Sequence, residues 1–181
     1  MILLIELLFG AATAGVLTWL FFTASEKNIA ALEKLCRNRI AGIAYALPAA
    51  LLCVPLAIPV SPDFLILWLY PLAVVLPVLC YFHIDHYAAR GVSFFLILLA
   101  YDAIHGVFEN HIPGAGVITI ILLSSGIAAI WLSAVPCTLR DIFRKAAAGK
   151  YWKYAASAAA AVMSLLYLYI FIMMIIGVFV K

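Results

Sequence analysis

The sequence predicts an all-α fold: a polytopic transmembrane helical bundle of about six spans, with both termini outside. Three observations lead to this prediction. Of the 181 residues, 69% are hydrophobic and 10% are charged, whereas roughly half of a soluble domain is apolar and about a quarter is charged. Several apolar runs reach the length of about 20 residues that crosses a bilayer as a helix. Nearly all basic residues fall on one side of the resulting layout.

The apolar runs divide the chain into the spans of a single integral membrane domain, residues 1–181. We expect no cleavable signal peptide, because the first run lacks a basic leading segment and is long enough to span. Spans and short connections account for the whole chain, so no separate soluble domain is expected. The predicted spans cover approximately residues 2–23, 40–60, 64–83, 91–109, 115–137 and 155–180.

Positive charge predicts which side of the protein is cytoplasmic. The two longer connections, 24–39 and 138–154, lie on the same side, and ten of the eleven Lys and Arg residues fall on that side. Only Lys181 falls on the other side. Because cytoplasmic loops carry an excess of Lys and Arg, we expect both linkers to be cytoplasmic, in an inner (plasma) membrane of the bacterial type.

Each linker carries a local pattern. In the first, TASE at 23–26 predicts a helix-capping box, and Glu33 and Arg37 have the spacing of an ion pair on one helix. In the second, residues 140–154 read RDIFRKAAAGKYWKY, in which aromatic residues interleave with basic ones. We expect linker 138–154 to lie on anionic lipid. A docking surface for a soluble partner is the alternative.

The fourth predicted span ends in a polar stretch, YDAIHGVFENH at residues 101–111. Asp102, His105 and Glu109 have the spacing i, i+3, i+7, which places them on one helical face. Glu6, near the start of the first span, is expected at a similar depth. No Lys or Arg is available in that half of the predicted bilayer.

These acidic residues therefore need a partner that the sequence does not supply. An ionised carboxylate in hydrocarbon costs at least about 2.5–3.5 kcal/mol. A proton, a metal ion or a cationic ligand would remove that cost, so we interpret Asp102, His105, Glu109 and Glu6 as a ligand- or ion-binding site. In the alternative interpretation, Asp102 and His105 make hydrogen bonds between helices, while Glu109 and residues 110–111 emerge into water.

Metal binding is a narrower version of the same hypothesis. Asp102, His105, Glu109 and His111 are side chains that Zn²⁺, Mn²⁺ or Fe²⁺ accepts, although no cofactor is required by the sequence. A second cluster, HIDH at 83–86, lies near the opposite end of the spans. His86 is nineteen residues from His105, or about 28 Å along a helix, so the two clusters cannot form one site.

The inner cluster has a weak metal pattern of its own. Cys80 and His83 are spaced i, i+3 and would need another cysteine, such as Cys36 or Cys137, to bind zinc. No C-x-x-C pair is present in the sequence, so incidental thiols beside an aqueous loop are the favoured interpretation.

Prolines and small residues suggest how the spans pack. The small residues Gly10, Ala11, Ala14 and Gly15 follow Glu6 and predict close helix packing on that face. Prolines remove helical hydrogen bonds, and broken helices often line cavities in transporters. SSG at 124–126 could offer hydroxyl groups to the interior or bond its own backbone. The prolines inside the predicted second and third spans are Pro48, Pro55, Pro59, Pro71 and Pro77.

Known intramembrane enzyme motifs are incomplete. YD at 101–102 lacks the second aspartate of an aspartyl dyad, because GAG at 114–116 is followed by Val117. No histidine follows His111 to serve SSG as a base, and H-E-x-x-H is absent from the sequence. An enzyme is therefore not the favoured class.

Three functional hypotheses follow. The first is a small transporter or channel-like component that handles protons, a cation or a small cationic solute through the acidic and histidine cluster. The second is a non-catalytic subunit or assembly factor of a larger membrane complex, docking through its first and last spans. The third is a metal-dependent membrane enzyme. The expected partners are the bilayer, anionic lipid, and a membrane protein or a second copy of the chain; no nucleic acid is expected.

Overall fold

The computed structural model describes residues 2–180, and these residues form helices without any strand. Six of the helices are long and apolar enough to cross a membrane, by length and composition. The predicted all-α fold is thus confirmed, and so is the prediction of six helices long and apolar enough to span a membrane. The helices are α1 (Ile2–Thr23), α2 (Ile29–Cys36), α3 (Arg39–Ala57), the 3-10 turn η1 (Ile58–Val60), α4 (Asp63–His83), α5 (Tyr87–Glu109), α6 (Ala115–Ala134), α7 (Cys137–Ala148) and α8 (Lys150–Val180).

The helix boundaries differ from the apolar boundaries mainly at one end of the bundle. Helix α5 begins at Tyr87 instead of 91, and α8 begins at Lys150 instead of 155. The sequence prediction followed the apolar runs, but backbone hydrogen bonding continues into the polar residues that flank them. The ends of these helices therefore do not coincide with the ends of the apolar runs.

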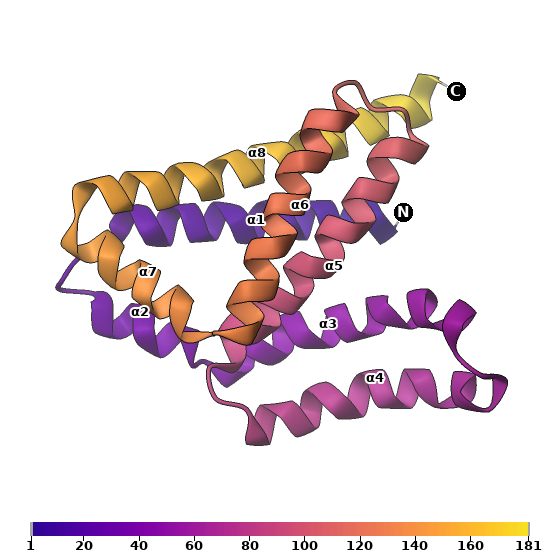
Figure 1. Cartoon of the computed structure of the whole chain (residues 1–181), viewed down its shortest axis with the longest axis horizontal. Coiled ribbons are helices and arrows are strands. Elements are labelled where there is room, and N and C mark those ends of the chain that lie inside the picture. The colour runs from indigo at the N-terminus through magenta and orange to yellow at the C-terminus, as the bar shows by residue number, and fades with distance from the viewer. Residues whose placement is uncertain (1, 181) are drawn as a thin grey trace.

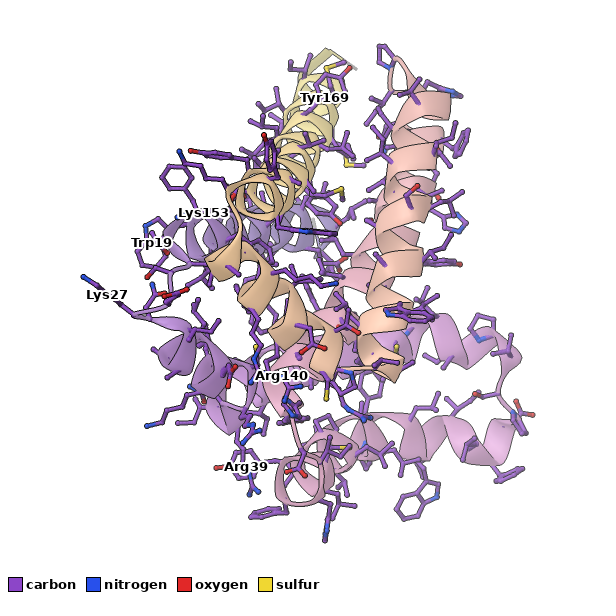
Figure 2. All side chains as sticks on the ribbon, turned by 60° about the vertical axis from the view of Figure 1, so that its left-hand side comes forward. Trp19, Lys27, Arg39, Arg140, Lys153 and Tyr169 are labelled. Carbon is purple, nitrogen blue, oxygen red and sulfur yellow. The ribbon has the colours of Figure 1, made fainter. Side chains whose placement is uncertain are left out.

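The six long helices run back and forth between two ends of the molecule (Figure 1). The start of α1, the end of α8, and the α3–α4 and α5–α6 connections lie at one end, which we call the terminal end. Helices α2 and α7 and the α4–α5 connection lie at the other, the basic end. Figure 2 shows Lys27, Arg39 and Arg140 at the basic end, and Tyr169 far from them.

Helix α5 is the centre of the bundle. It is the most buried of the six spans, and it packs against α3 and α6. Helices α1 and α8 lie side by side, and both contact α5, where Leu3 of α1 and Met174 of α8 pack against Gly106. Helix α4 is the least buried span and packs against α3 at the edge of the molecule.

Small residues bring α1 close to its neighbours, as the sequence predicted. Gly10 leaves no room for a side chain, because a Cβ there would overlap the side chain of Leu99 in α5 and lie 3.5 Å from Tyr167 in α8. The Ser164 hydroxyl donates a hydrogen bond of 2.9 Å to the carbonyl oxygen of Ala11. Gly10 is thus part of the internal packing and not of a surface for docking a partner.

A second close approach joins α3 to α5. A Cβ on Gly91 would lie 2.5 Å from the carbonyl oxygen of Gly42, and a Cβ on Gly42 would lie 2.7 Å from the carbonyl carbon of Tyr87. The two backbones touch at this point. Helices within a membrane associate through close van der Waals contacts of this kind, because the hydrophobic effect does not drive apolar helices together in lipid.

The capping box expected at 23–26 is wrong. Helix α2 begins at Ile29, and the preceding turn is held by Asn28, whose Oδ1 accepts a hydrogen bond of 2.8 Å from the backbone N–H of Ser25. The Asn28 amide also donates to the carbonyl oxygen of Thr23. The Asn28 side chain thus folds back on Thr23 and Ser25 and makes a turn here in place of a Ser/Thr cap.

The ion pair expected between Glu33 and Arg37 is also replaced. Glu33 accepts a hydrogen bond from the Nε of Arg144, which lies in α7. Helices α2 and α7 pack against each other at the basic end, so Arg144 meets Glu33 across their interface. A tertiary contact has displaced the local pairing.

The prolines of α3 and α4 occur within continuous helices, except for Pro59, which lies in η1 where α3 gives way to the connection. The Tyr87 hydroxyl donates a hydrogen bond of 2.7 Å to the carbonyl oxygen of Pro77, which links α5 to α4. In SSG, both serine hydroxyls bond carbonyl oxygens of their own helix, at Ile120 and Leu122.

The contact between Gly42 and Gly91 makes a stability prediction. We expect Gly91→Ala to separate α3 from α5 and to lower the free energy of unfolding by about 1–3 kcal/mol, the usual cost of overpacking. Thermal unfolding of the purified protein in mild detergent measures this loss of stability. Gly116→Ala is the control, because a Cβ there meets nothing within 4 Å. Equal unfolding temperatures for the two variants would contradict the expectation.

Candidate functional site

Two acidic residues of the predicted site face each other between α1 and α5. The contact of Gly10 with Leu99 sets the register of the two helices. One turn nearer the terminal end, the carboxyl group of Glu6 lies within hydrogen-bonding reach of the carboxyl group of Asp102. Glu6 is 6% exposed and therefore lies inside the bundle, and Asp102 is partly buried.

This carboxyl contact constrains the protonation of the pair. An ionised carboxylate only accepts hydrogen bonds, so the contact becomes a hydrogen bond only when one of the two groups carries a proton. The Glu6 Oε2 atom is buried and has no hydrogen-bond donor among the described residues. The pair can therefore hold a proton, or a cation placed between the two groups.

Among residues 2–180, neither Glu6 nor Asp102 forms an ion pair with a Lys or Arg. The ion pairs among residues 2–180 are those of Arg140 with Asp141 and Arg144 with Glu33, and both lie at the basic end. Thr13, two turns along α1 from Glu6, continues the polar face: its hydroxyl lies 3.0 Å from that of Tyr45 in α3.

His105 lies one turn beyond Asp102 and is exposed. Its ring packs against that of Tyr101, with ring centroids 4.5 Å apart and an angle of 57° between the planes. His105 is close enough to Asp102 to interact with it electrostatically. It therefore lies between the carboxyl pair and the surface of the molecule.

Glu109 and His111 are farther out. Both are exposed, at the end of α5 and in the connection that follows. The neighbouring Asn110 side chain donates to the carbonyl oxygen of Gly106 and closes the helix end. Of the four predicted ligand-binding residues, the structure thus brings Glu6 and Asp102 into contact, places His105 nearby and leaves Glu109 at the periphery.

No metal-binding set is assembled within residues 2–180. No group of three or more His, Cys, Asp and Glu side chains in this part of the chain could hold a metal ion. This covers both the outer candidates, Asp102, His105, Glu109 and His111, and the inner ones around Cys80 and His83.

Cys36 belongs to the packing between α2 and α7. Its side chain is 3% exposed and lies in a small core with Phe21, Leu32 and Phe143. Burial, and secondarily the nearby charge of Glu33, raise the pKa of the Cys36 thiol from about 9 to about 11. A thiol in this state is a structural apolar side chain.

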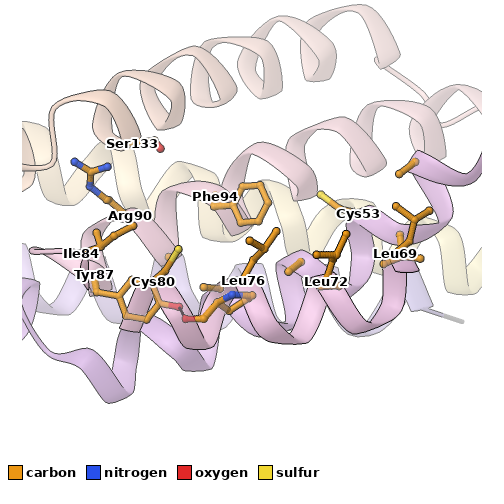
Figure 3. A pocket seen from close by; sticks show the side chains of 17 residues that line it. Cys53, Leu69, Leu72, Leu76, Cys80, Ile84, Tyr87, Arg90, Phe94 and Ser133 are labelled. Atoms are coloured by element: carbon orange, nitrogen blue, oxygen red, sulfur yellow. Dashed lines mark hydrogen bonds between the residues drawn. The ribbon is translucent and has the colours of Figure 1, made fainter. Parts of the chain in front are cut away.

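The sequence analysis missed two interior features. Tyr167 is fully buried, although the bulky half of the last span offers several equivalent aromatic residues. Its side chain and that of Ser125 line a cavity of about 80 Å³. The second feature is a larger groove that ends at Arg90 (Figure 3). The one signal for it in the sequence was a lone arginine directly before the fourth apolar run, 91–109.

Comparison of the chain with protein-family models, with curated proteins and with solved structures finds no match.

The environment of Cys36 predicts its reactivity. The thiolate is the nucleophile, and a pKa raised by about two units lowers its fraction about a hundredfold near neutral pH. We expect N-ethylmaleimide at pH 8 to leave Cys36 unmodified in the folded protein, while the partly exposed Cys137 reacts. Peptide mass spectrometry measures the extent of modification at each cysteine. All four cysteines should react after denaturation. Labelling of Cys36 as fast as Cys137 before unfolding would contradict its burial.

Proposed function

We propose that the protein is a small membrane transporter or channel-like component that binds protons, or a small cation, at the Glu6–Asp102 pair. One observation carries the proposal: two carboxyl groups from different spans face each other in an apolar bundle, without an ion pair to a Lys or Arg. Ionisable residues inside membrane segments most often mark ion and proton pathways.

The energetics favour an occupied pair. Two ionised carboxylates about 4 Å apart repel each other by about 4 kcal/mol at an effective dielectric constant of about 20. This repulsion adds to the cost of holding each charge away from water. A shared proton or a bound cation removes both penalties. Loss of the proton or cation restores both penalties, so the apolar surroundings favour the occupied form of the pair.

Polar side chains lie on both sides of the pair. His105, one turn from Asp102, is exposed and separates the pair from the surface of the molecule. On the other side, the hydroxyl groups of Thr13 and Tyr45 continue the polar contacts toward the middle of α1 and α3. In the orientation that the positive charges favour, the pair would open to the outer side of the membrane.

Flux through reconstituted protein tests this proposal. We expect vesicles that contain the protein and a trapped pH dye to equilibrate an imposed pH gradient faster than empty vesicles. Asp102→Asn and Glu6→Gln should each slow this flux at least about tenfold, because the amide cannot exchange a proton at these positions. Asp63→Asn is the matched control, since Asp63 is exposed at the same end of the bundle.

Two outcomes would contradict the proposal. One is a wild-type flux of H⁺, Na⁺, K⁺ and Mn²⁺ no greater than that of empty vesicles. The other is an unchanged flux in Asp102→Asn. Infrared spectroscopy supplies a check that does not depend on transport: the carbonyl band of a protonated carboxyl group should be present in the wild type and lost in the double variant.

The second hypothesis, a non-catalytic subunit or assembly factor, is favoured by the position of α4. This helix packs against α3 at the edge of the molecule and leaves large side chains such as Phe64, Leu67 and Trp68 exposed at its terminal end. A subunit would co-purify with one partner in fixed stoichiometry from native membranes in mild detergent, and Asp102→Asn would not disturb that complex.

A further inference from the structure

A groove runs between α3, α4 and α5, away from the packed face that holds Glu6. Its volume is about 490 Å³, and it opens to the outside of the bundle. The space exists because small residues, among them Ala46 and Ala50 of α3 and Ala73 of α4, face one another where larger side chains would close it. Leu72, Leu76 and Phe94 line its length (Figure 3).

The groove is apolar along its length but has a cation at its basic end. Arg90 of α5 lines that end, beside Tyr87 and Ile84 (Figure 3). The Nε atom of Arg90 is buried and has no hydrogen-bond partner among the described residues. Neither of the ion pairs in this part of the chain involves Arg90. A buried guanidinium donor without an acceptor is costly unless a ligand supplies one.

Further positive charge gathers around the same point. Burial, followed by the charges of Arg37 and Arg140, lowers the pKa of His86 below its usual range; Arg90 acts in the same direction, and Asp85 opposes them. The His86 Nδ1 atom is also buried without a partner among residues 2–180. Arg140 is paired with Asp141. The local field at the start of α5 is therefore positive.

From this charge and shape we propose that the groove binds one membrane lipid with an anionic phosphate headgroup. The phosphate accepts hydrogen bonds from Arg90, and the hydrocarbon tail lies along the groove between α3 and α4. Arginine presents a planar fork of donors that matches phosphate oxygens. The start of α5 marks the level at which the headgroups of the surrounding bilayer would lie, so a lipid can enter sideways with its phosphate already at the height of Arg90.

The dimensions favour a lipid tail over a helix of another protein. A helix with its side chains is about 10 Å across, and a single turn is about 5.4 Å long, so about one turn would use most of the groove. An extended hydrocarbon chain fits the same volume along its length. This inference does not use the proposed role of Glu6 and Asp102, because its phosphate site at Arg90 lies at the opposite end of the bundle.

Native mass spectrometry of the full chain in mild detergent tests the proposal, with phosphatidylglycerol and phosphatidylcholine as probes. We expect one phosphatidylglycerol to remain bound to the wild type and phosphatidylcholine to bind at least about tenfold more weakly, since its headgroup carries no net charge. Arg90→Gln should weaken phosphatidylglycerol binding about tenfold, and Arg90→Lys less, because it keeps the charge but loses the fork. Lys27→Gln removes the same charge at an exposed position of the basic end and should leave binding unchanged.

A second measurement does not depend on a variant that folds. Cys53 and Cys80 line the groove, whereas Cys137 does not. Phosphatidylglycerol should slow the reaction of Cys53 and Cys80 with N-ethylmaleimide in the wild type and leave Cys137 unaffected. Inorganic phosphate should give no such protection, because it lacks the tail.

The proposal is overturned by any of three results. Phosphatidylcholine could bind and protect as well as phosphatidylglycerol, which would make the groove a nonspecific apolar surface. Arg90→Gln, shown to be folded by its elution volume and helical content, could bind phosphatidylglycerol as well as Lys27→Gln does. Alternatively, a cross-linker at Cys53 could capture a protein segment in the groove in native membranes, which would make it a protein-docking site.

Discussion

The architecture depends on close packing at a few glycines along α5 and its neighbours. Water drives apolar surfaces together in soluble proteins, but helices within a bilayer must gain their stability from packing. Gly10 against Leu99, Gly42 against Gly91 and Gly106 against Met174 supply that packing at three levels of the bundle. The first of these contacts also sets the register that places Glu6 opposite Asp102. Packing and the chemistry of the carboxyl pair are thus linked through α1.

The two ends of the bundle offer opposite electrostatic environments. At the terminal end, Glu6 and Asp102 face each other without an ion pair to a Lys or Arg of residues 2–180, and at the basic end the charges of Arg37, Arg140 and Arg90 act on His86. Each environment favours a counter-charge, because a charge in an apolar setting needs one. With the cation and the anionic lipid proposed above at opposite ends, pH and lipid composition would act on different parts of the protein.

Much of the fold could be predicted from the sequence, since apolar runs of bilayer length permit few structures other than helices. Local pairings were less predictable. Glu33 has a suitable partner in Arg37 four residues away, yet it bonds Arg144, which is brought near by the packing of α2 on α7. Similarly, the polar face of α5 could be recognised, but not the fact that Glu6 lies against Asp102. The register between two helices depends on the shapes of the side chains along both. A periodic pattern in one helix therefore cannot predict which residues of the other helix lie opposite it.

The pairing of α1 with α8 has a consequence for how the chain is made. The ribosome makes α1 before α8, and four long apolar helices, α3, α4, α5 and α6, are synthesised between them. During that interval the face around Ala11 must be covered by lipid or by another protein, because Ser164, which bonds it in the finished molecule, has not yet been translated. The contact between α1 and α8 therefore forms only after the intervening helices have been synthesised.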